Sequence, residues 1–220
     1  MIFGAVLFAK YSLVFADFLD EKKRNETGYF AFFRLDRYNL GMEDKVLTTL
    51  KKEHTVARNI VTVLFRIAED LRAKKSISLL YLKDLIGAIS GVMEMHHRNE
   101  MEVFAYLTPR AEITKEDLLA ILSEEHNLGY EYFQNALKII GLEGKSDNEK
   151  YELVPFHVDE YAKLLREHIR KEENGYFPMI TKFITNEEAK AITASFLKIE
   201  KEFKNKKNMQ IIELAVKQFH

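Results

Sequence analysis

The chain has 220 residues, with 33 Lys and Arg against 34 Asp and Glu, 47% hydrophobic residues and no cysteine. This length suits one domain, or one domain with an appendage, and is sufficient to bury a core. The formal net charge of −1 gives no electrostatic reason to expect nucleic-acid binding. The lack of cysteine excludes disulfides, thiolate metal sites and a thiol nucleophile, and it fits a reducing, cytoplasmic compartment. With only three prolines and nine glycines, the composition indicates a helix-rich protein.

Residues 1–40 are predicted to form an aromatic-rich extension of the main domain. The start of this segment is apolar, but Lys10 and Asp17 interrupt it, so it contains no uncharged run long enough to span a membrane. No positive residue precedes the apolar stretch, as it would in a secretory signal. We therefore expect neither a membrane span nor a signal peptide. The segment is interpreted either as an extra helix or arm, or as an upstream extension with Met42 as the natural start.

From Met42 onward, apolar residues recur at alternating steps of three and four, the spacing that places side chains on one face of a helix. Four such stripes cover residues 47–71, 82–107, 119–140 and 154–179. Short breaks with turn or cap signals separate them, at 73–76, 108–110 and 141–148. Ser146 and Glu149 have the spacing of a capping box, which predicts the start of the fourth helix.

Four long helices joined by short connections favour antiparallel neighbours. We therefore predict an all-α fold, with an up-down antiparallel four-helix bundle over residues 41–205 and a C-terminal helical tail over 206–220. A fifth, shorter helix is expected to start at the Thr185–Glu188 capping spacing. Pro155 lacks an N–H and clashes with the preceding helical turn. It therefore marks either the first position of the fourth helix or a kink in it.

Each stripe carries a histidine near its middle, and two stripes carry a glutamate one turn later. These six residues are His54, His96, Glu100, His126, His168 and Glu172. They occupy core positions, where an unpaired ionised carboxylate is very costly. A bound cation would compensate the buried carboxylates and use the imidazoles as ligands. The six residues are therefore predicted to be metal ligands.

The positions of the histidines along the helices predict that they meet. Antiparallel neighbours place two residues at the same level when the break between their helices lies midway between them in the sequence. For the four histidines taken in order, the midpoints are residues 75, 111 and 147. The first and third fall in the breaks at 73–76 and 141–148, and the second falls between Pro109 and Thr114, before the third stripe. In His96–Glu100 and in His168–Glu172, the spacing of four places both side chains on one face.

A constant shift along the sequence maps one half of this set onto the other. The related pairs are His54 with His126, His96 with His168, Glu100 with Glu172, Glu53 with Glu125, and Arg98 with Arg170. This repeat predicts two helical hairpins related by a pseudo-twofold axis.

The predicted donor set contains nitrogen and oxygen atoms without sulfur, which suits iron, manganese or zinc. If both glutamates bridge two metals, each metal receives two imidazoles and two carboxylate oxygens. Positions for a solvent bridge and an added ligand then stay open, as in a reactive centre. A single zinc ion would use only part of the set, so we predict two metals.

The order His, His-x-x-x-Glu, His, His-x-x-x-Glu resembles the hemerythrin-like (HHE cation-binding) family over about residues 42–205. The segment HIRKEENGYFPM at 168–179 is similar to that family's second signature block. The segment HHRNEMEVFAYL at 96–107 is similar to the first, although Ala105 and Tyr106 stand where Phe-Pro is common. The resemblance implies a non-haem di-iron centre that reacts with dioxygen, nitric oxide or peroxide, or that stores or senses iron.

The same resemblance makes two bridged iron ions the expected cofactor, ahead of manganese or zinc. The expected partner is a small diatomic ligand or peroxide, with no nucleic acid and no membrane. Ligand identity leaves open whether the reaction turns over, for example as catalase- or peroxidase-like chemistry. Metal binding should weaken below about pH 6, because the imidazoles must be neutral to bind.

The chain departs from the oxygen-carrying members of this family at one ligand position. Those members have a fifth histidine one turn after the first histidine of the third helix, and this chain has Tyr130 there. We interpret Tyr130 as a packing or hydrogen-bonding residue near the centre rather than a ligand. His97 lies about 100° around the helix from His96, so we expect it to face solvent.

Three other residues near the predicted ligands have open interpretations. His157 lies close to the face of His168 but three turns away, and is interpreted as a core histidine or as a residue lining an access route. Gly129 and Gly175 each follow a predicted ligand by three residues. They either make room for a small ligand or allow close approach of helices.

Three other function classes compete with this interpretation. A ferritin-like centre needs two Glu-x-x-His motifs, and only Glu94–His97 has that spacing. A metal-free interaction bundle would use its polar core residues to fix helix register. An iron-responsive regulator would couple metal loading to exposure of a partner surface.

Overall fold

The computed structural model describes residues 42–110, 116–142, 146–203 and 205–219, and their regular structure is helical. The predicted all-α class is thus confirmed for these residues, which belong to one structural unit. The predicted extension at 1–40 lies outside them. None of the described helices combines the length and the apolar character that a membrane span needs.

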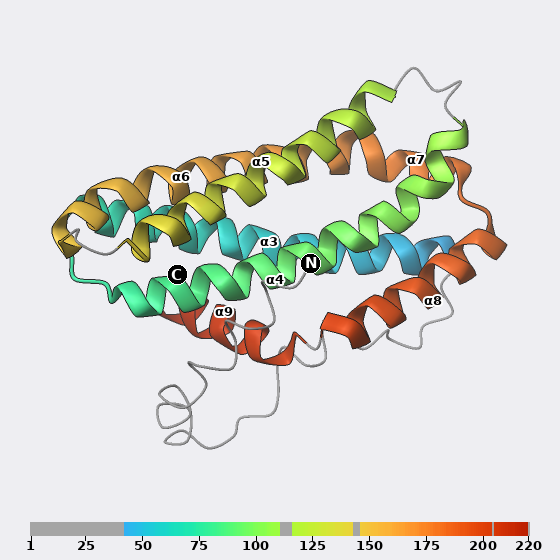
Figure 1. The fold of residues 1–220 in the computed structure, drawn as a ribbon. Helices are drawn as coiled ribbons and strands as arrows, with labels where there is room; N and C mark the ends of the chain where they lie inside the picture. Colours follow the sequence, from blue (N-terminus) through green and yellow to red (C-terminus); the bar gives the residue numbers. More distant parts are fainter. Residues whose placement is uncertain (1–41, 111–115, 143–145, 204, 220) are drawn as a thin grey trace. The chain divides into compact units, whose positions relative to one another are not determined.

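Four long helices correspond to the four predicted stripes. They are α3 (Met42–Arg72), α4 (Leu79–Leu107), α5 (Glu116–Ile140) and α6 (Asp147–Lys171). Helix α3 packs against α4 and α6, and α5 packs against the same two helices. Figure 1 shows α3 and α4 side by side, with α5 and α6 next to them. Each of these four helices therefore contributes one face to a common interior.

The breaks between these helices use local hydrogen bonds that the sequence supplies. Just after α3, Lys74 has a left-handed φ of 56°, and the amide of Lys75 donates to the carbonyl of Asp70. This is the Schellman pattern of a helix C-terminus. Ser146 and Glu149 form the predicted capping box of α6. Pro155 lies inside α6, so the alternative in which the helix begins at that proline is wrong.

After α6 the chain continues as one turn of π-helix, η2 (Glu172–Tyr176), and a short helix, α7 (Phe177–Phe183). A single turn, η1 (Thr108–Arg110), follows α4. In a π-helix the backbone bonds run to the fifth residue, and such turns are frequent at functional sites. Here the amide of Phe177 donates to the carbonyl of Glu172, a predicted metal ligand.

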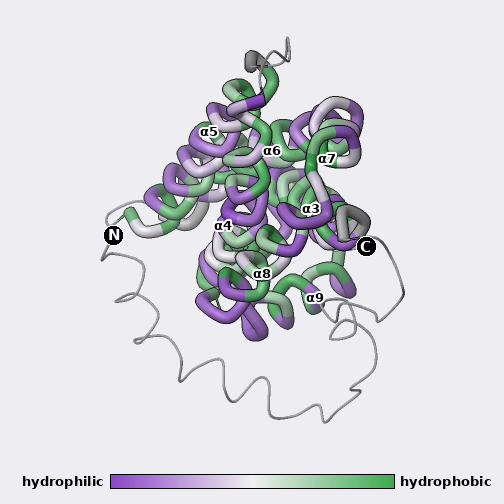
Figure 2. The backbone as a smooth tube through the Cα atoms, turned by 90° about the vertical axis from the view of Figure 1, so that its right-hand side faces the viewer, coloured by the Kyte–Doolittle hydropathy of each residue, from purple (hydrophilic) through white to green (hydrophobic). Residues whose placement is uncertain are grey.

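Two further helices cover the other side of α3 and α4. They are α8 (Asn186–Phe203), with the predicted Thr185–Glu188 capping contacts, and α9 (Lys206–Phe219). Both pack on α3 and α4, so the described helices form three tiers with α3 and α4 in the middle (Figures 1 and 2). The centre of α3 and of α4 is consequently enclosed from both sides, which isolates the polar residues there from water.

The buried residues are mostly aliphatic and aromatic, with few polar exceptions. Among the described residues the buried polar or charged ones are Glu53, His54, His96, Asn99, Glu100, Asp159, His168, Glu172 and Thr193. Five of the six predicted ligands belong to this set. Buried charges in a helical core need specific compensation, so these residues mark a candidate functional site.

Candidate metal centre

The structure brings all six predicted ligand residues together in the interior of α3, α4, α5, α6 and η2. The side chains of His54, Glu100 and Glu172 are completely buried, and that of His126, at 12%, is the most exposed of the six. The rings of His54 and His96 have centroids 5.2 Å apart, and those of His126 and His168 are 4.8 Å apart. The predicted shared level of the imidazoles is thus observed, in two pairs.

Glu100 lies between the two pairs of imidazoles. Its Oε1 atom is 3.2 Å from Nε2 of His96, and its Oε2 atom is 3.3 Å from Nε2 of His126. One carboxylate therefore places one oxygen at each pair.

Glu172 repeats this arrangement from the opposite side of the bundle. Its Oε2 atom is 3.0 Å from Nε2 of His54, and its Oε1 atom is 3.3 Å from Nε2 of His168. Each imidazole pair is thus flanked by one oxygen of each glutamate. We name these groups the first half-site (His54 and His96) and the second half-site (His126 and His168).

Most of these facing atoms lack a hydrogen bond. The Nε2 atoms of His54 and His96 and all four carboxylate oxygens of Glu100 and Glu172 are buried without an acceptable partner. The atoms lie close together but not in hydrogen-bonding geometry. Unpaired buried polar atoms carry a large desolvation cost, which a cation bound among them would offset. The donor set therefore fits a metal centre.

The outer nitrogens of three imidazoles are held by carboxylates that the sequence analysis did not assign to the site. Nδ1 of His96 lies 2.8 Å from Oε2 of Glu53, whose other oxygen accepts from Asn99 at 2.6 Å. Nδ1 of His168 lies 2.9 Å from Oε2 of Glu125, which also pairs with Lys171. A carboxylate at Nδ1 favours the tautomer that keeps Nε2 free for a metal.

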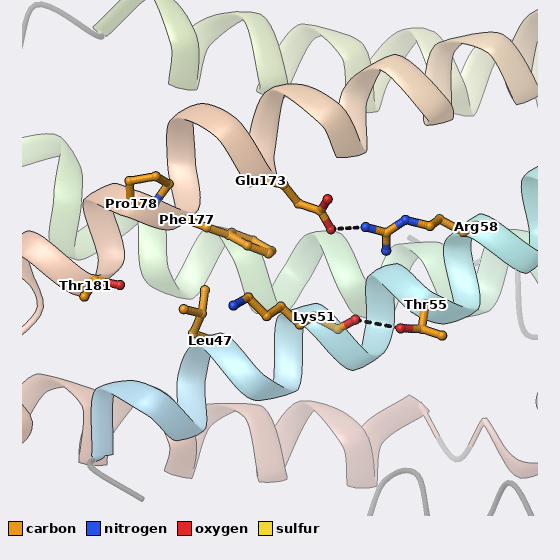
Figure 3. Close-up of a pocket in the computed structure, with 8 residues that line it drawn as sticks. All are labelled: Leu47, Lys51, Thr55, Arg58, Glu173, Phe177, Pro178 and Thr181. Carbon is orange, nitrogen blue, oxygen red and sulfur yellow. Dashed lines mark hydrogen bonds and ion pairs between the residues drawn. The ribbon is translucent and has the colours of Figure 1, made fainter.

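The third such carboxylate is Glu173, in η2. Its Oε1 atom lies 3.0 Å from Nδ1 of His54, and it also pairs with Arg58. Figure 3 shows Glu173 and Arg58 pointing toward each other across the gap between α3 and η2. The sequence repeat had already singled out Glu53 and Glu125, whereas no repeat marks Glu173.

The opposite charges of these imidazoles and carboxylates stabilise one another. Burial opposes the charged form of His96, but Glu100 and Glu53 outweigh it and hold the pKa of His96 well above its usual value. Burial also opposes protonated His168, yet Glu125 and Glu172 raise its pKa to about 9. For Glu100, burial is outweighed by His96 and its other neighbours, and the pKa lies well below normal. Without a metal, protonated imidazoles thus compensate the buried carboxylates.

Two sets of donors meet the distance requirement for a common metal ion. One is His54, His96, Glu100 and Glu172, and the other is His97, Glu100, His126 and His168. Within each set, one ligand atom per residue lies within 4.8 Å of all the others. Glu100 belongs to both, as a bridging residue would.

The profile of the hemerythrin HHE cation-binding domain matches residues 45–180, more than half of the chain. The chain belongs to the hemerythrin HHE family. The predicted resemblance is thus confirmed, and the matched range contains all six predicted ligand residues. No curated protein and no solved structure matches the chain significantly.

Two residues of this hemerythrin HHE domain lie differently from the sequence-based interpretation. His97 is half-buried instead of facing solvent, and its ring stacks on His126 with centroids 3.8 Å apart and planes at 14°. Burial, followed by the charge of His126, holds the pKa of His97 well below its usual value, which favours a neutral imidazole. Tyr130 is 60% exposed, so it neither packs nor hydrogen-bonds at the centre.

The hemerythrin HHE domain also has a surface groove beside the first half-site. The groove has a volume of about 490 Å³ and is lined by Leu47, Lys51, Thr55, Arg58, Glu173, Phe177, Pro178 and Thr181. In Figure 3 the Phe177 ring projects from the start of α7 toward α3. The same ring stacks on His54 with centroids 4.7 Å apart. Phe177 and Glu173 therefore separate His54 from the surface.

His157 lies near the rings of Tyr132 and Phe156 and belongs to neither donor set.

The two glycines near the predicted ligands allow neighbouring side chains to approach closely, and they do not line a ligand pocket. A Cβ at Gly175 would lie 2.6 Å from Cδ2 of Leu118, and a Cβ at Gly129 would lie 3.0 Å from the Tyr161 ring. The space above both glycines in this hemerythrin HHE domain is thus filled.

Replacing Gly175 by leucine is expected to destabilise the fold by about 1–3 kcal/mol, because the new side chain overpacks the contact with Leu118. The matched control is Gly87→Leu, in α4, where nothing lies within 4 Å of the Cβ position. There the better helix propensity of leucine should give a neutral or stabilising change, up to about 1 kcal/mol. Urea unfolding measures both, and equal free energies of unfolding for the two variants would contradict the packing role of Gly175.

Proposed function

We propose that this protein is a non-haem di-iron protein whose centre binds or reacts with dioxygen, nitric oxide or peroxide. The supporting observation is that Glu100 and Glu172 each place one oxygen at each half-site. Two carboxylates in this position suit two metal ions that share them, held in an up-down four-helix bundle of α3 to α6. Nitrogen and oxygen donors without sulfur suit iron, and manganese and zinc are the alternatives.

The proposed ligands divide into two unequal groups. His54 and His96 would hold one ion, and His126 and His168 with His97 would hold the other. Glu100 belongs to both donor sets, and Glu172, a member of the first set, would be shared through its Oε1 atom near His168. His97 then supplies a fifth imidazole from α4, whereas Tyr130 of α5 faces solvent. The second half-site would be richer in nitrogen than the first, so the two positions would differ in metal affinity.

The protein's own residues have three tasks in this proposal. Glu53, Glu125 and Glu173 orient the imidazoles through Nδ1 and keep Nε2 directed inward. Glu100 and Glu172 neutralise the positive charge of the bound cations. The surrounding apolar residues exclude water, which strengthens these interactions. When bound, two ferrous ions would supply one electron each to a small oxidant.

The second candidate function is an iron-responsive sensor, storage or regulatory protein that does not turn over a substrate. It is favoured by the cluster of buried, unpaired donor atoms, which links metal occupancy directly to the stability of the bundle. Loss of metal would then destabilise the bundle and expose a surface for a partner. This would appear as a large increase in protease sensitivity on iron removal.

Metal analysis of the aerobically purified protein tests the proposal. We expect about two irons per chain, as in other two-metal sites, together with the visible absorption of an oxygen-bridged diferric centre. A chain that holds only zinc, or no metal after iron-supplemented expression, would contradict the di-iron proposal. Repeated consumption of peroxide by the reduced protein would then favour a reactive centre over the second candidate, because a sensor without turnover would not consume peroxide repeatedly.

A further inference from the structure

Tyr176 is a buried phenol whose hydroxyl group has no partner. The residue is 0% exposed, and its OH group makes no hydrogen bond within the described structure. It is the last residue of η2 and lies four positions after Glu172, so both side chains lie on one side of the turn. An unsatisfied buried hydroxyl is costly, which calls for an acceptor that the protein itself does not provide.

The surroundings of Tyr176 explain the lack of a protein partner. Its ring packs edge-on against Phe104, with centroids 4.8 Å apart and planes at 90°. The same cluster of buried residues includes Leu50 and Leu122, which lie one turn before His54 and His126. None of these three residues carries a polar side-chain atom. The phenol thus brings a hydrogen-bond donor into an otherwise apolar layer directly beside the proposed ligands.

Two observations place the hydroxyl on the side of the bridging carboxylates. Long side chains on a helix point back toward its N-terminus, which for Tyr176 is the direction of Glu172. In addition, Phe104, on which the ring packs, lies four positions after Glu100, just as Tyr176 lies four positions after Glu172, so the phenol lies about one turn from both carboxylates. Burial and then the charges of Glu100 and Glu172 hold the pKa of Tyr176 well above its usual value. The group therefore stays protonated and can donate.

We propose that the Tyr176 hydroxyl donates a hydrogen bond to the small exogenous ligand of the metal centre, on the side of Glu100 and Glu172. This inference rests on the proposed function and names a residue that orients the bound ligand. Glu100 and Glu172 are themselves unpaired, yet neither lies in hydrogen-bonding geometry to the phenol. A small anion or diatomic molecule between the carboxylates would offer the acceptor that the hydroxyl lacks.

Azide, a small anion that absorbs in the visible when bound to ferric iron, is the probe for this proposal. The variant Tyr176→Phe removes only the hydroxyl and keeps the ring that packs on Phe104. We expect it to retain the wild-type iron content and to bind azide about tenfold more weakly, the effect of one lost hydrogen bond. The matched control is Tyr161→Phe in α6, whose ring packs against Phe133 with centroids 3.8 Å apart. Its azide affinity should equal that of the wild type.

A second measurement follows the hydrogen bond itself. The infrared stretch of bound azide should shift between H₂O and D₂O in the wild type and in Tyr161→Phe, and this shift should disappear in Tyr176→Phe. Wild-type azide affinity in Tyr176→Phe, or a shift that persists there, would overturn the inference. Loss of iron from Tyr176→Phe would also overturn it, since the hydroxyl would then support the metal ligands. A wild-type protein without iron would instead refute the proposed function, before any variant is compared.

Discussion

Replacing Glu100 by glutamine is expected to remove nearly all bound metal. Replacing His97 by alanine should abolish or weaken the binding of only one ion. Glu100 places one oxygen at His96 and the other at His126, so both metal positions depend on its charge. Glutamine keeps the shape of the side chain but lacks the negative charge that bridging needs. We expect metal content to fall from about two ions per chain to near zero in Glu100→Gln. In His97→Ala we expect about one ion, because His97 belongs to only one of the two donor sets.

Metal analysis after removal of free ions measures both effects, and circular dichroism confirms that the helices are retained. His157→Ala is the control, since His157 belongs to neither donor set and should leave both ions bound. An unchanged metal content in Glu100→Gln would refute the shared carboxylate. Two ions retained in His97→Ala with wild-type affinity would show that the stacked His97 ring is not a ligand.

The convergence of the four histidines was predictable because it depends only on distances along the helices. Antiparallel neighbours with short connections fix the level of each residue, and the midpoints of the histidine pairs fell between the stripes. The glutamates one turn later then had to enter the same interior. The internal repeat of the sequence also marked Glu53 and Glu125, which the structure places at Nδ1 of His96 and His168.

The predictions that were wrong concern the direction in which a side chain points around its helix axis. That direction relative to the core depends on how neighbouring helices are rotated. His97 lies on the flank of α4 that faces α5, so its ring contacts His126 although it is off the main stripe. On α5 the buried face passes from His126 through Gly129 to Phe133, which leaves Tyr130 beside it in solvent. Glu173 reaches His54 because η2 is a π-helix, and the sequence gives no signal for that change of backbone pattern.

Removing the metal is expected to lower the melting temperature strongly, and to do so more at pH 9 than at pH 7. Free metal at 1,000 times its dissociation constant stabilises the folded state by about 4 kcal/mol per site. For a domain of this size, this corresponds to a shift of about 8–16 °C per site. The metal replaces the protonated imidazoles as the counter-charge of Glu100 and Glu172, so its absence matters most where those imidazoles lose their protons.

The direction of the pH dependence follows from His168. In the metal-free protein its pKa is about 9, above the usual value of 6.5, because Glu125 and Glu172 outweigh the opposing effect of burial. The stabilisation from protonated His168 is fully present below pH 6.5 and is lost as the pH rises through 9. In the metal-bound protein the imidazoles are already neutral, so no such loss occurs. The gap between the two melting temperatures should therefore widen from pH 7 to pH 9, and metal binding at pH 7 should release protons.

Calorimetry with and without a strong chelator at the two pH values measures this gap. Glu100→Gln provides the control, because a variant that binds almost no metal should melt at the same temperature with and without chelator. A gap that stays constant or narrows toward pH 9 would mean that protonated histidines do not compensate the buried carboxylates in the metal-free protein. The mutual charge compensation seen around His96, His168 and Glu100 would then not govern stability, and the apolar packing of α3 to α6 would hold the empty centre together by itself.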